Sequence, residues 1–374
     1  MTRLSKVAIV GAGIAGRMLA WQLQQSGCHV TLFERQTKHN YSAASSVAAG
    51  MLAPYSELEH SPFELFQAGV LSKQYWRAIS QALAFESSVN NYGSLVLAHQ
   101  PDQYLLTRLH SNLTHKLPHA CAHSELPIVA ANQIEPELSE SFARALYFAN
   151  EASVDPQVVL AALLQKLEQD GAQLNFATEV IDLAPFKLTT PVTTHYYDWI
   201  FDCRGLAAKS QYSQLRGVRG EIIQLESRHL NLRHHLRLLH PRYQIYLVPR
   251  TNGHTYLLGA TEIETENDQA ITVHSALELL SAAFSLHHHF AQANITATYA
   301  NLRPTFNNHL PKITHQTGLT RLNGLYRHGY LLAPLLSTMI VNTIIGKSSK
   351  LISLTDQNLK TMQSFADAIT EDQR

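Results

Sequence analysis

Cysteine is scarce in this 374-residue chain, and neither sign of charge is in excess. The three cysteines, Cys28, Cys121 and Cys203, lie far apart and match neither a disulfide framework nor a metal-ligand spacing, which predicts a reducing compartment. Lysine and arginine together number 29, as do aspartate and glutamate, so the formal net charge is zero. Because there is no basic surplus, we expect no nucleic-acid partner.

A long uninterrupted hydrophobic run is also missing. The most apolar late segment, Tyr330 to Ile345, contains Pro334 and several polar residues. It is shorter than the ~20 residues that a membrane-spanning helix needs, so we expect a buried helix there. The N-terminus shows no signal-peptide pattern. We therefore expect a cytoplasmic protein with no membrane span. No metal site is expected at His287 to His289, because adjacent side chains on a helix point in different directions.

What the chain does have is a glycine-rich turn between its first strand and first helix. Gly11, Gly13 and Gly16 follow the apolar run Lys6–Val10 and open a helical pattern over Ile14–Gln25. In this fingerprint the first glycine permits the tight turn, and the second lets backbone approach a pyrophosphate. The third lets the helix pack closely on the strand. The pattern predicts a dinucleotide site, and the alternative is a glycine-rich turn without function.

Glu34 strengthens the dinucleotide prediction, because it ends the second expected strand, His29–Glu34. Its carboxylate is placed to accept hydrogen bonds from both ribose hydroxyls and would repel a 2′-phosphate, which disfavours NADP. NAD and FAD share the fingerprint. FAD is favoured here because the next nucleotide-domain strand comes only after residue 170, and the C-terminal segment returns to the same domain.

The pattern of elements predicts two interleaved domains in an α/β (α+β) fold. Asp155 and Pro156 begin a helix that Gly171 ends. A strand is expected over Ala172–Ile181 and a helix from Pro334. Antiparallel strands are expected at Gly220–Leu225, Gln244–Pro249, Tyr256–Thr261 and Ala293–Leu302. We predict a Rossmann-like FAD-binding domain of residues 1–85, 150–212 and 320–374, interleaved with an antiparallel-sheet substrate domain of residues 86–149 and 213–319.

Three polar side chains in apolar surroundings are candidates for binding a substrate carboxylate. Arg303 is the first choice, because a bidentate arginine is the strongest common partner for a carboxylate that leaves water. Arg327 and Tyr246 would add a second guanidinium and a phenol. The alternatives are structural ion pairs for the two arginines and a core position for the tyrosine.

These motifs resemble the glycine oxidase and D-amino-acid oxidase family of flavoproteins, and glycine oxidase in particular. The resemblance runs in order from residue 6 to about 346 and is carried by Ser45–Pro54, Tyr246–Arg250, Gly259–Thr261, Asn301–Pro304 and Arg327–Pro334. It implies oxidative deamination of a small amino acid or amine, of glycine, sarcosine or D-amino-acid type. A hydride would pass from the α-carbon to flavin N5, with oxygen as the acceptor that yields hydrogen peroxide.

The resemblance also assigns residues to FAD. It implies that Val180 contacts the adenine through its backbone, that Cys203 to Gly205 close the nucleotide pocket, and that Gly329 to Leu332 run beside the flavin. The helix after Pro334 would place its positive end near the ring. Noncovalent FAD is expected, because no cysteine follows Cys203. The predicted cofactor residues are Gly11, Gly13, Ile14, Ala15, Gly16, Glu34, Arg35, Ser45, Ser46, Ala49, Gly50, Met51, Val180, Cys203, Gly205, Arg327, Gly329, Tyr330, Leu331 and Leu332.

Two residues depart from the glycine oxidase pattern and put the identity of the substrate in question. Glu262 stands where that enzyme has an apolar residue, and His328 follows the second arginine. Glu262 either holds the substrate amine, favours a second cationic group, or is a solvated loop acid. The predicted substrate residues are thus Tyr246, Arg303, Arg327 and Glu262.

Alternative functions remain open at this stage. They are a dehydrogenase with another electron acceptor, a tRNA-base carboxymethylaminomethyl oxidase, and a flavin-binding protein without catalysis. A homo-oligomer is compatible with the resemblance.

Overall fold

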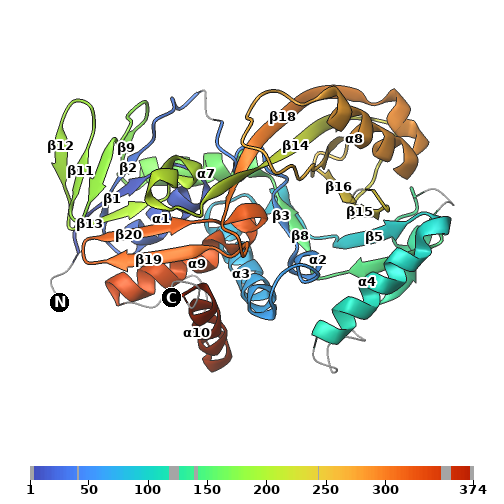
Figure 1. The fold of residues 1–374 in the computed structure, drawn as a ribbon, viewed down its shortest axis with the longest axis horizontal. Helices are drawn as coiled ribbons and strands as arrows, with labels where there is room; N and C mark the ends of the chain where they lie inside the picture. The colour runs from blue at the N-terminus through green and yellow to red at the C-terminus, as the bar shows by residue number, and fades with distance from the viewer. Residues whose placement is uncertain are drawn as a thin grey trace.

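The computed structural model describes residues 4–39, 42–117, 126–138, 142–242, 244–346 and 355–370. Cys121, one of the three cysteines, lies outside these residues. Two large sheets lie side by side along the long axis of the molecule (Figure 1). This mixed arrangement of helices and sheets confirms the predicted fold class.

A six-stranded sheet carries the first glycine-rich turn. Its core is parallel, with β1 between β2 and β13, and only the edge strand β19 is antiparallel. The order is β19 (Lys312–Gln316), β20 (Leu319–Asn323), β13 (Trp199–Asp202), β1 (Lys6–Val10), β2 (His29–Phe33) and β9 (Gln173–Asn175).

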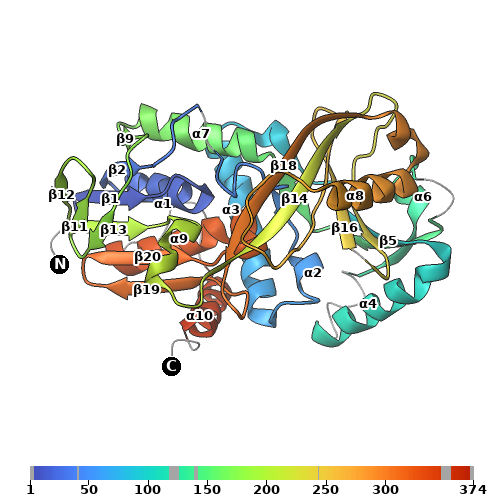
Figure 2. The same ribbon diagram turned by 45° about the horizontal axis from the view of Figure 1, so that its top comes forward.

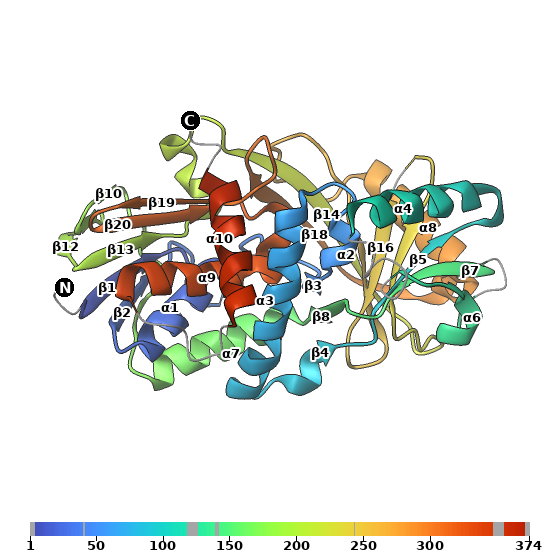
Figure 3. The same cartoon turned by 90° about the horizontal axis from the view of Figure 1, so that it is seen from below.

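Both faces of this sheet are covered, which explains why β1 is an almost continuous apolar run. Val7 and Ile9 point into a cluster with the helices. Ala8 and Val10 point the other way, toward the small sheet of β10 (Asp182–Ala184), β11 (Lys187–Thr189) and β12 (Thr194–Tyr196). The helical side is seen from below in Figure 3 and contains α1 (Ile14–Gln25), α3 (Phe63–Ala82), α7 (Pro156–Gln169), α9 (Gly329–Ile345) and α10 (Asp356–Thr370).

The start and end signals of α7 are confirmed. The Asp155 side chain accepts a hydrogen bond from the backbone N–H of Gln157 at 2.9 Å, and Pro156 is the first helical residue. Gly171 follows the helix with a φ of 82°, a left-handed conformation that favours glycine.

The eight-stranded sheet is mostly antiparallel, with one parallel pair between β15 and β5. Alternate residues of β5 face opposite sides. Leu95 and Leu97 pack toward α8 (Val273–Leu286), whereas Val96 and Ala98 pack toward α4 (Gln103–Lys116). Figure 2 shows these two helices with β5. The strand order is β18 (Asn294–Thr305), β14 (Arg216–Glu226), β17 (Thr255–Gly259), β16 (Gln244–Pro249), β15 (His235–Leu239), β5 (Ser94–Ala98), β7 (Arg144–Phe148) and β6 (Ile128–Ala130).

The remaining elements are short. They are β3 (Met51–Leu52), β8 (Ala152–Val154), β4 (Val89–Asn90), α2 (Pro54–Glu57), α6 (Ala131–Ile134), η1 (Glu86–Ser88), η2 (Gln100–Asp102), η3 (Gly205–Gln211), η4 (His288–Gln292) and η5 (Tyr326–His328).

The prediction that the last apolar helix begins at Pro334 is wrong, because α9 begins at Gly329 and contains this proline. Proline has no N–H to donate to the carbonyl of Tyr330 one turn earlier. The Trp76 indole N–H donates to that carbonyl at 2.8 Å instead. A side chain from α3 thus satisfies the acceptor that the proline leaves free.

The helical run is also longer than the apolar segment that the sequence predicts. With η5, the helical run Tyr326–Ile345 reaches 20 residues with a mean hydropathy of 1.4, enough by length and composition to cross a membrane. However, 72% of its apolar window is buried inside the protein, where α9 packs against α1 and α3. These properties are those of a core helix.

Two other sequence expectations differ from the structure. The strand expected over Ala172–Ile181 is only three residues long, because the chain leaves the sheet after Asn175. The predicted substrate domain, residues 213–319, includes β19, but this strand pairs with β20 in the six-stranded sheet. The hairpin connection keeps these two strands adjacent, so the boundary expected at residue 319/320 falls inside one hairpin.

Candidate active site

A cavity of about 1650 Å³ lies between the two large sheets. One side is formed by the glycine turn after β1 and the end of β13, and the other by strands of the eight-stranded sheet. Of the predicted cofactor residues, Gly16, Ser46, Val180 and Leu332 do not line it, whereas all four predicted substrate residues do. Among the described residues, no group of three or more His, Cys, Asp or Glu is placed to hold a metal ion.

Close backbone packing explains the glycines at the turn. Gly11 has a φ of 100°, and a Cβ there would lie 2.6 Å from the carbonyl oxygen of Cys203. A Cβ on Gly16 would lie 1.9 Å from the carbonyl oxygen of Gly11. The turn therefore presents only backbone to the cavity, and the first N–H groups of α1, which starts after Gly13, have no partner within the helix. This cradle fits the diphosphate of a dinucleotide.

Glu34 lines the cavity beside this turn. One carboxylate oxygen accepts the N–H of Ala12 at 2.8 Å, and the other accepts the N–H of Gln36 at 3.0 Å. Each oxygen keeps acceptor capacity after these bonds. The carboxylate is thus fixed in place with lone pairs left for hydroxyl donors.

The loop before β3 is tied to elements on both sides of the cavity. Ser45 accepts the N–H of Ile14 through its hydroxyl at 3.2 Å and the Tyr330 hydroxyl through its carbonyl at 2.8 Å. The guanidinium of Arg250 donates to the carbonyl of Ala49 at 2.9 Å. These bonds hold the loop against the N-terminus of α1, where the glycine fingerprint predicts the pyrophosphate.

The predicted cofactor residues outside the cavity wall have other surroundings. The Val180 side chain packs with Val10 and Phe33 in the cluster behind β1, and Leu332 is fully buried among the helices. Ser46 donates its hydroxyl to the carbonyl of Ala43 at 2.8 Å. Their side chains are therefore structural in the described conformation.

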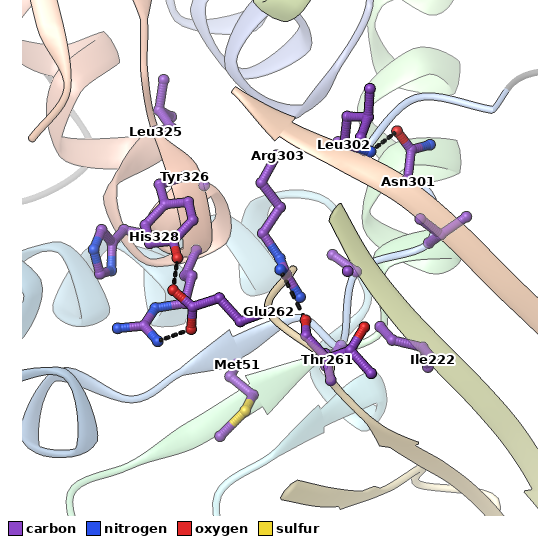
Figure 4. A pocket seen from close by; sticks show the side chains of 18 of the residues that line it. Met51, Ile222, Thr261, Glu262, Asn301, Leu302, Arg303, Leu325, Tyr326 and His328 are labelled. Carbon is purple, nitrogen blue, oxygen red and sulfur yellow. Dashed lines mark hydrogen bonds and ion pairs between the residues drawn. The ribbon is translucent and has the colours of Figure 1, made fainter. Parts of the chain in front are cut away.

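Arg303 projects from β18 into the pocket (Figure 4). Its guanidinium lies directly over Gly220 of the neighbouring strand β14. A Cβ on that glycine would lie only 2.1 Å from Nη2. One nitrogen, Nη1, donates to the carbonyls of Thr261 at 3.2 Å and Arg219 at 3.4 Å. Within the part of the chain that the structure describes, no carboxylate forms an ion pair with Arg303. Arg303 therefore brings to the pocket a positive charge that no acid of the described residues neutralises.

Tyr246 stands close to this cation. Burial raises the pKa of its phenol above the usual value, although the nearby cations Arg303, Arg250 and Arg327 act in the opposite direction. The phenol is thus neutral at ordinary pH and has a proton to donate. A carboxylate bound at Arg303 has a second donor within the same pocket.

Arg327 is placed differently from Arg303, because two carboxylates pair with it. Its Nη2 lies 3.1 Å from Glu57 Oε2, and its Nη1 lies 3.1 Å from Glu262 Oε2. Glu57 is the main reason why the pKa of Arg327 is raised. Burial tends to raise the pKa of Glu57, but the positive charges around it, Arg327 foremost, outweigh burial, so this pKa is lowered. The geometry thus favours the structural alternative for Arg327 over a role as second carboxylate ligand.

Glu57 and Arg237 were not predicted from the sequence. Glu57 ends α2, some 270 positions before its partner Arg327, and no local pattern relates the two. Arg237 lines the cavity and donates to Glu59 at 3.0 Å and to the Ser56 carbonyl at 3.2 Å. His328 is 1% exposed, and burial lowers its pKa to about 4, so it is neutral near pH 7.

Replacement of Gly220 by alanine tests the position of Arg303. The new Cβ displaces the end of a flexible side chain, so we expect a small change in melting temperature. We expect carboxylate affinity to fall roughly 10- to 100-fold, because a displacement of about 1 Å is enough for such a loss. Ligand titration of the flavin spectrum measures it. Gly217→Ala on the same strand, which meets Leu206 and Leu302 instead, is the matched control. Equal losses in both variants would contradict the placement of Arg303.

A buried acid next to this site predicts a pH effect on stability. Glu151 has no exposed surface and accepts the N–H and hydroxyl of Ser56 at 2.6 and 2.9 Å. Burial raises its pKa from 4.5 to about 7, although hydrogen bonds from Ser94 and Ser56 oppose the rise. Its contribution to stability is present below pH 4.5, where it is protonated in both states, and is lost as the pH rises through 7.

We therefore expect Glu151→Gln, which mimics the protonated acid, to gain stability over the wild type as the pH increases from 4.5 to 8. The difference should approach roughly 3 kcal/mol at the upper end. Denaturant unfolding of both proteins across this range measures it. Parallel stability curves would show that Glu151 titrates normally.

Comparisons with known proteins agree with this geometry. A family model described as FAD dependent oxidoreductase, DAO, matches residues 6–343. A Rhizobium etli protein named as the thiamine biosynthesis oxidoreductase ThiO is 36% identical over 340 residues, which cover 91% of this chain and 96% of that protein. Glycine oxidase of Geobacillus kaustophilus is 26% identical over 365 residues, covering 93% and 95%. A crystal structure of glycine oxidase from Geobacillus kaustophilus matches with a TM-score of 0.80 at 25% identity, covering 95% of this chain and 98% of that one.

Proposed function

The chain belongs to the DAO family of FAD-dependent oxidoreductases, and from this premise we propose that it oxidises a small amino acid of the glycine type. The observation that supports the proposal most directly is Arg303, which lines the cavity between the two sheets and has no carboxylate partner among the residues that the structure describes. A charge in such a position is stabilised when an anionic ligand pairs with it.

The residues that would hold FAD, which is noncovalent in this proposal, are those of the glycine turn, Glu34 and the loop at Ser45 to Met51. When bound, FAD supplies an acceptor for the hydride that leaves the α-carbon of the substrate. The protein contributes orientation. Arg303 and the neutral phenol of Tyr246 hold the substrate carboxylate, which fixes the neighbouring carbon and amine within the cavity.

We further propose that oxygen is the electron acceptor, that hydrogen peroxide is released, and that the enzyme acts in the cytoplasm. Relatives named glycine oxidase support a glycine-type substrate, and the one named ThiO supports a role in thiamine biosynthesis. The geometry around Arg303 supports an α-amino acid rather than a simple amine, because an amine alone has no group for the guanidinium.

An anaerobic screen tests this function. The purified yellow protein is mixed with glycine, sarcosine, D-alanine and amines without a carboxylate, and the flavin band near ~450 nm is followed. We expect bleaching by the amino acids only, and recovery with peroxide formation when oxygen is admitted. Bleaching by simple amines alone would contradict the role of Arg303, and slow reoxidation would contradict oxygen as acceptor.

A further inference from the structure

Glu262 crosses the pocket from one wall to the other. It follows β17 in the segment Ala260–Glu262, and its side chain reaches η5, where it accepts a hydrogen bond from the Tyr326 hydroxyl and pairs with Arg327 (Figure 4). The side chain is 44% exposed and lines the cavity. It is therefore accessible to a ligand, unlike the more enclosed Glu57, whose side chain is 21% exposed.

The charges around the pocket show why this acid matters. Arg303 and Arg327 are cations, and Glu57 and Glu262 are anions, so the four charges sum to zero. Arg327 keeps Glu57 as a partner if Glu262 turns toward a ligand. Glu262 can therefore bind a cation without leaving Arg327 unpaired, and it is the more exposed of the two acids, at 44% against 21% for Glu57.

The guanidinium of Arg303 also contacts the backbone directly before Glu262. Arg303 Nη1 donates to the carbonyl of Thr261, and Glu262 is the following residue. Consecutive Cα atoms are about 3.8 Å apart, so the acid's backbone begins about one residue from the carbonyl that the guanidinium contacts. Opposite charges arranged in this way match a zwitterion, with a carboxylate at Arg303 and an ammonium group at Glu262.

We propose that Glu262 binds the amine of the substrate and makes the site specific for amino acids with a protonated amine and a single carboxylate. This inference rests on the proposed function, since it concerns the same pocket. A ligand with a second carboxylate near its amine would be repelled by Glu262. Because the acid stabilises the charged amine, it also raises the pH at which the bound amine becomes neutral and reactive.

Binding measurements separate the amine from the carboxylate. The ligands are glycine and propionate, which carries a methyl group in place of the ammonium. Propionate binding is read from changes in the flavin spectrum, and glycine binding from the concentration dependence of the first spectral change after rapid anaerobic mixing. We expect Glu262→Gln to weaken glycine binding roughly 10- to 100-fold, the range for loss of a hydrogen bond to a charged group. Propionate binding should stay the same or tighten, and iminodiacetate should gain relative to glycine. The rise of kcat with pH should move to lower pH in the variant.

Glu264→Gln is the matched control. Glu264 is an exposed acid two residues further along the same loop, paired with Arg216 at 3.1 Å and absent from the cavity wall. Its replacement should change the binding of neither glycine nor propionate. Equal losses for glycine and propionate in Glu262→Gln, or unchanged glycine binding, would overturn the inference.

Failure of this inference is distinguishable from failure of the proposed function. If the wild type binds glycine in a Glu262-dependent manner but no amino acid bleaches the flavin, the function is wrong and the amine site stands. If amino acids bleach the flavin of wild type and Glu262→Gln with the same affinity, the function stands and the amine site is wrong.

Discussion

Replacement of Arg303 by leucine should abolish most of the activity and leave the folded holoenzyme intact. We expect kcat/KM for the best amino acid of the screen to fall roughly 10²- to 10³-fold, the loss for removal of one partner of a buried hydrogen-bonded charge pair. The flavin spectrum and the melting temperature should change little. Arg303 donates to two backbone carbonyls and pairs with no carboxylate of the described residues, so its removal strands no buried charge.

Arg327→Leu should have the opposite effect, with stability lost and most of the activity kept. Its removal leaves Glu57 largely buried without its main cation, which should cost roughly 3 kcal/mol of the free energy of unfolding. Measurement of kcat/KM and of denaturant unfolding on both variants separates the two roles. Arg228→Leu, at a side chain that is 84% exposed, is the surface control.

The contrast fails if Arg303→Leu loses stability and activity together. It also fails if Arg327→Leu keeps its stability and loses only carboxylate affinity. The latter result would restore the role that the sequence suggested for Arg327, with Glu57 and Glu262 as partners that a substrate displaces.

The sequence predicted those features whose causes are local. The helix α7 has its start and stop signals within the chain segment that forms it, at Asp155 and Gly171. The glycine turn could likewise be identified from spacing, since the strand, the glycines and the helix follow each other directly. The burial of β1 on both faces of its sheet also follows from the apolar run.

The features that sequence could not supply depend on partners far along the chain. The start of α9 could not be predicted, because the carbonyl that Pro334 leaves free accepts its hydrogen bond from the indole of Trp76, on another helix. The two arginines look alike in the sequence, and only the fold brings Glu57 and Glu262 to Arg327 while leaving Arg303 without an acid. Charge compensation of this kind is a tertiary property, so residue type and spacing do not reveal it.

The surroundings of each glycine decide whether the cofactor site depends on it. A left-handed glycine with open space around it costs only backbone strain when replaced, whereas a glycine in contact with another backbone segment forces two elements apart. Gly171 is of the first kind, because a Cβ there meets nothing within 4 Å. Gly16 is of the second kind, because its Cβ would meet the carbonyl of Gly11.

We therefore expect Gly16→Ala to yield protein without FAD. The methyl group cannot be accommodated at 1.9 Å from the Gly11 oxygen, so α1 must move away from the turn after β1, and its N-terminal N–H groups move with it. The free energy of unfolding should fall by about 3 kcal/mol or more, at the upper end of the costs of overpacking. The ratio of flavin absorbance to protein absorbance and the denaturant midpoint measure both effects.

Gly171→Ala is the control that separates loss of stability from loss of the cofactor. Its strain in the left-handed region costs about 1–2 kcal/mol, but its position after α7 lies outside the cavity wall, so the protein should stay yellow. Heat or acid should then release the flavin of wild type and Gly171→Ala into the supernatant, because the predicted attachment is noncovalent. A yellow Gly16→Ala protein would show that the turn tolerates a wider gap between helix and strand. Close packing of helix and strand would then not explain why the third glycine is needed.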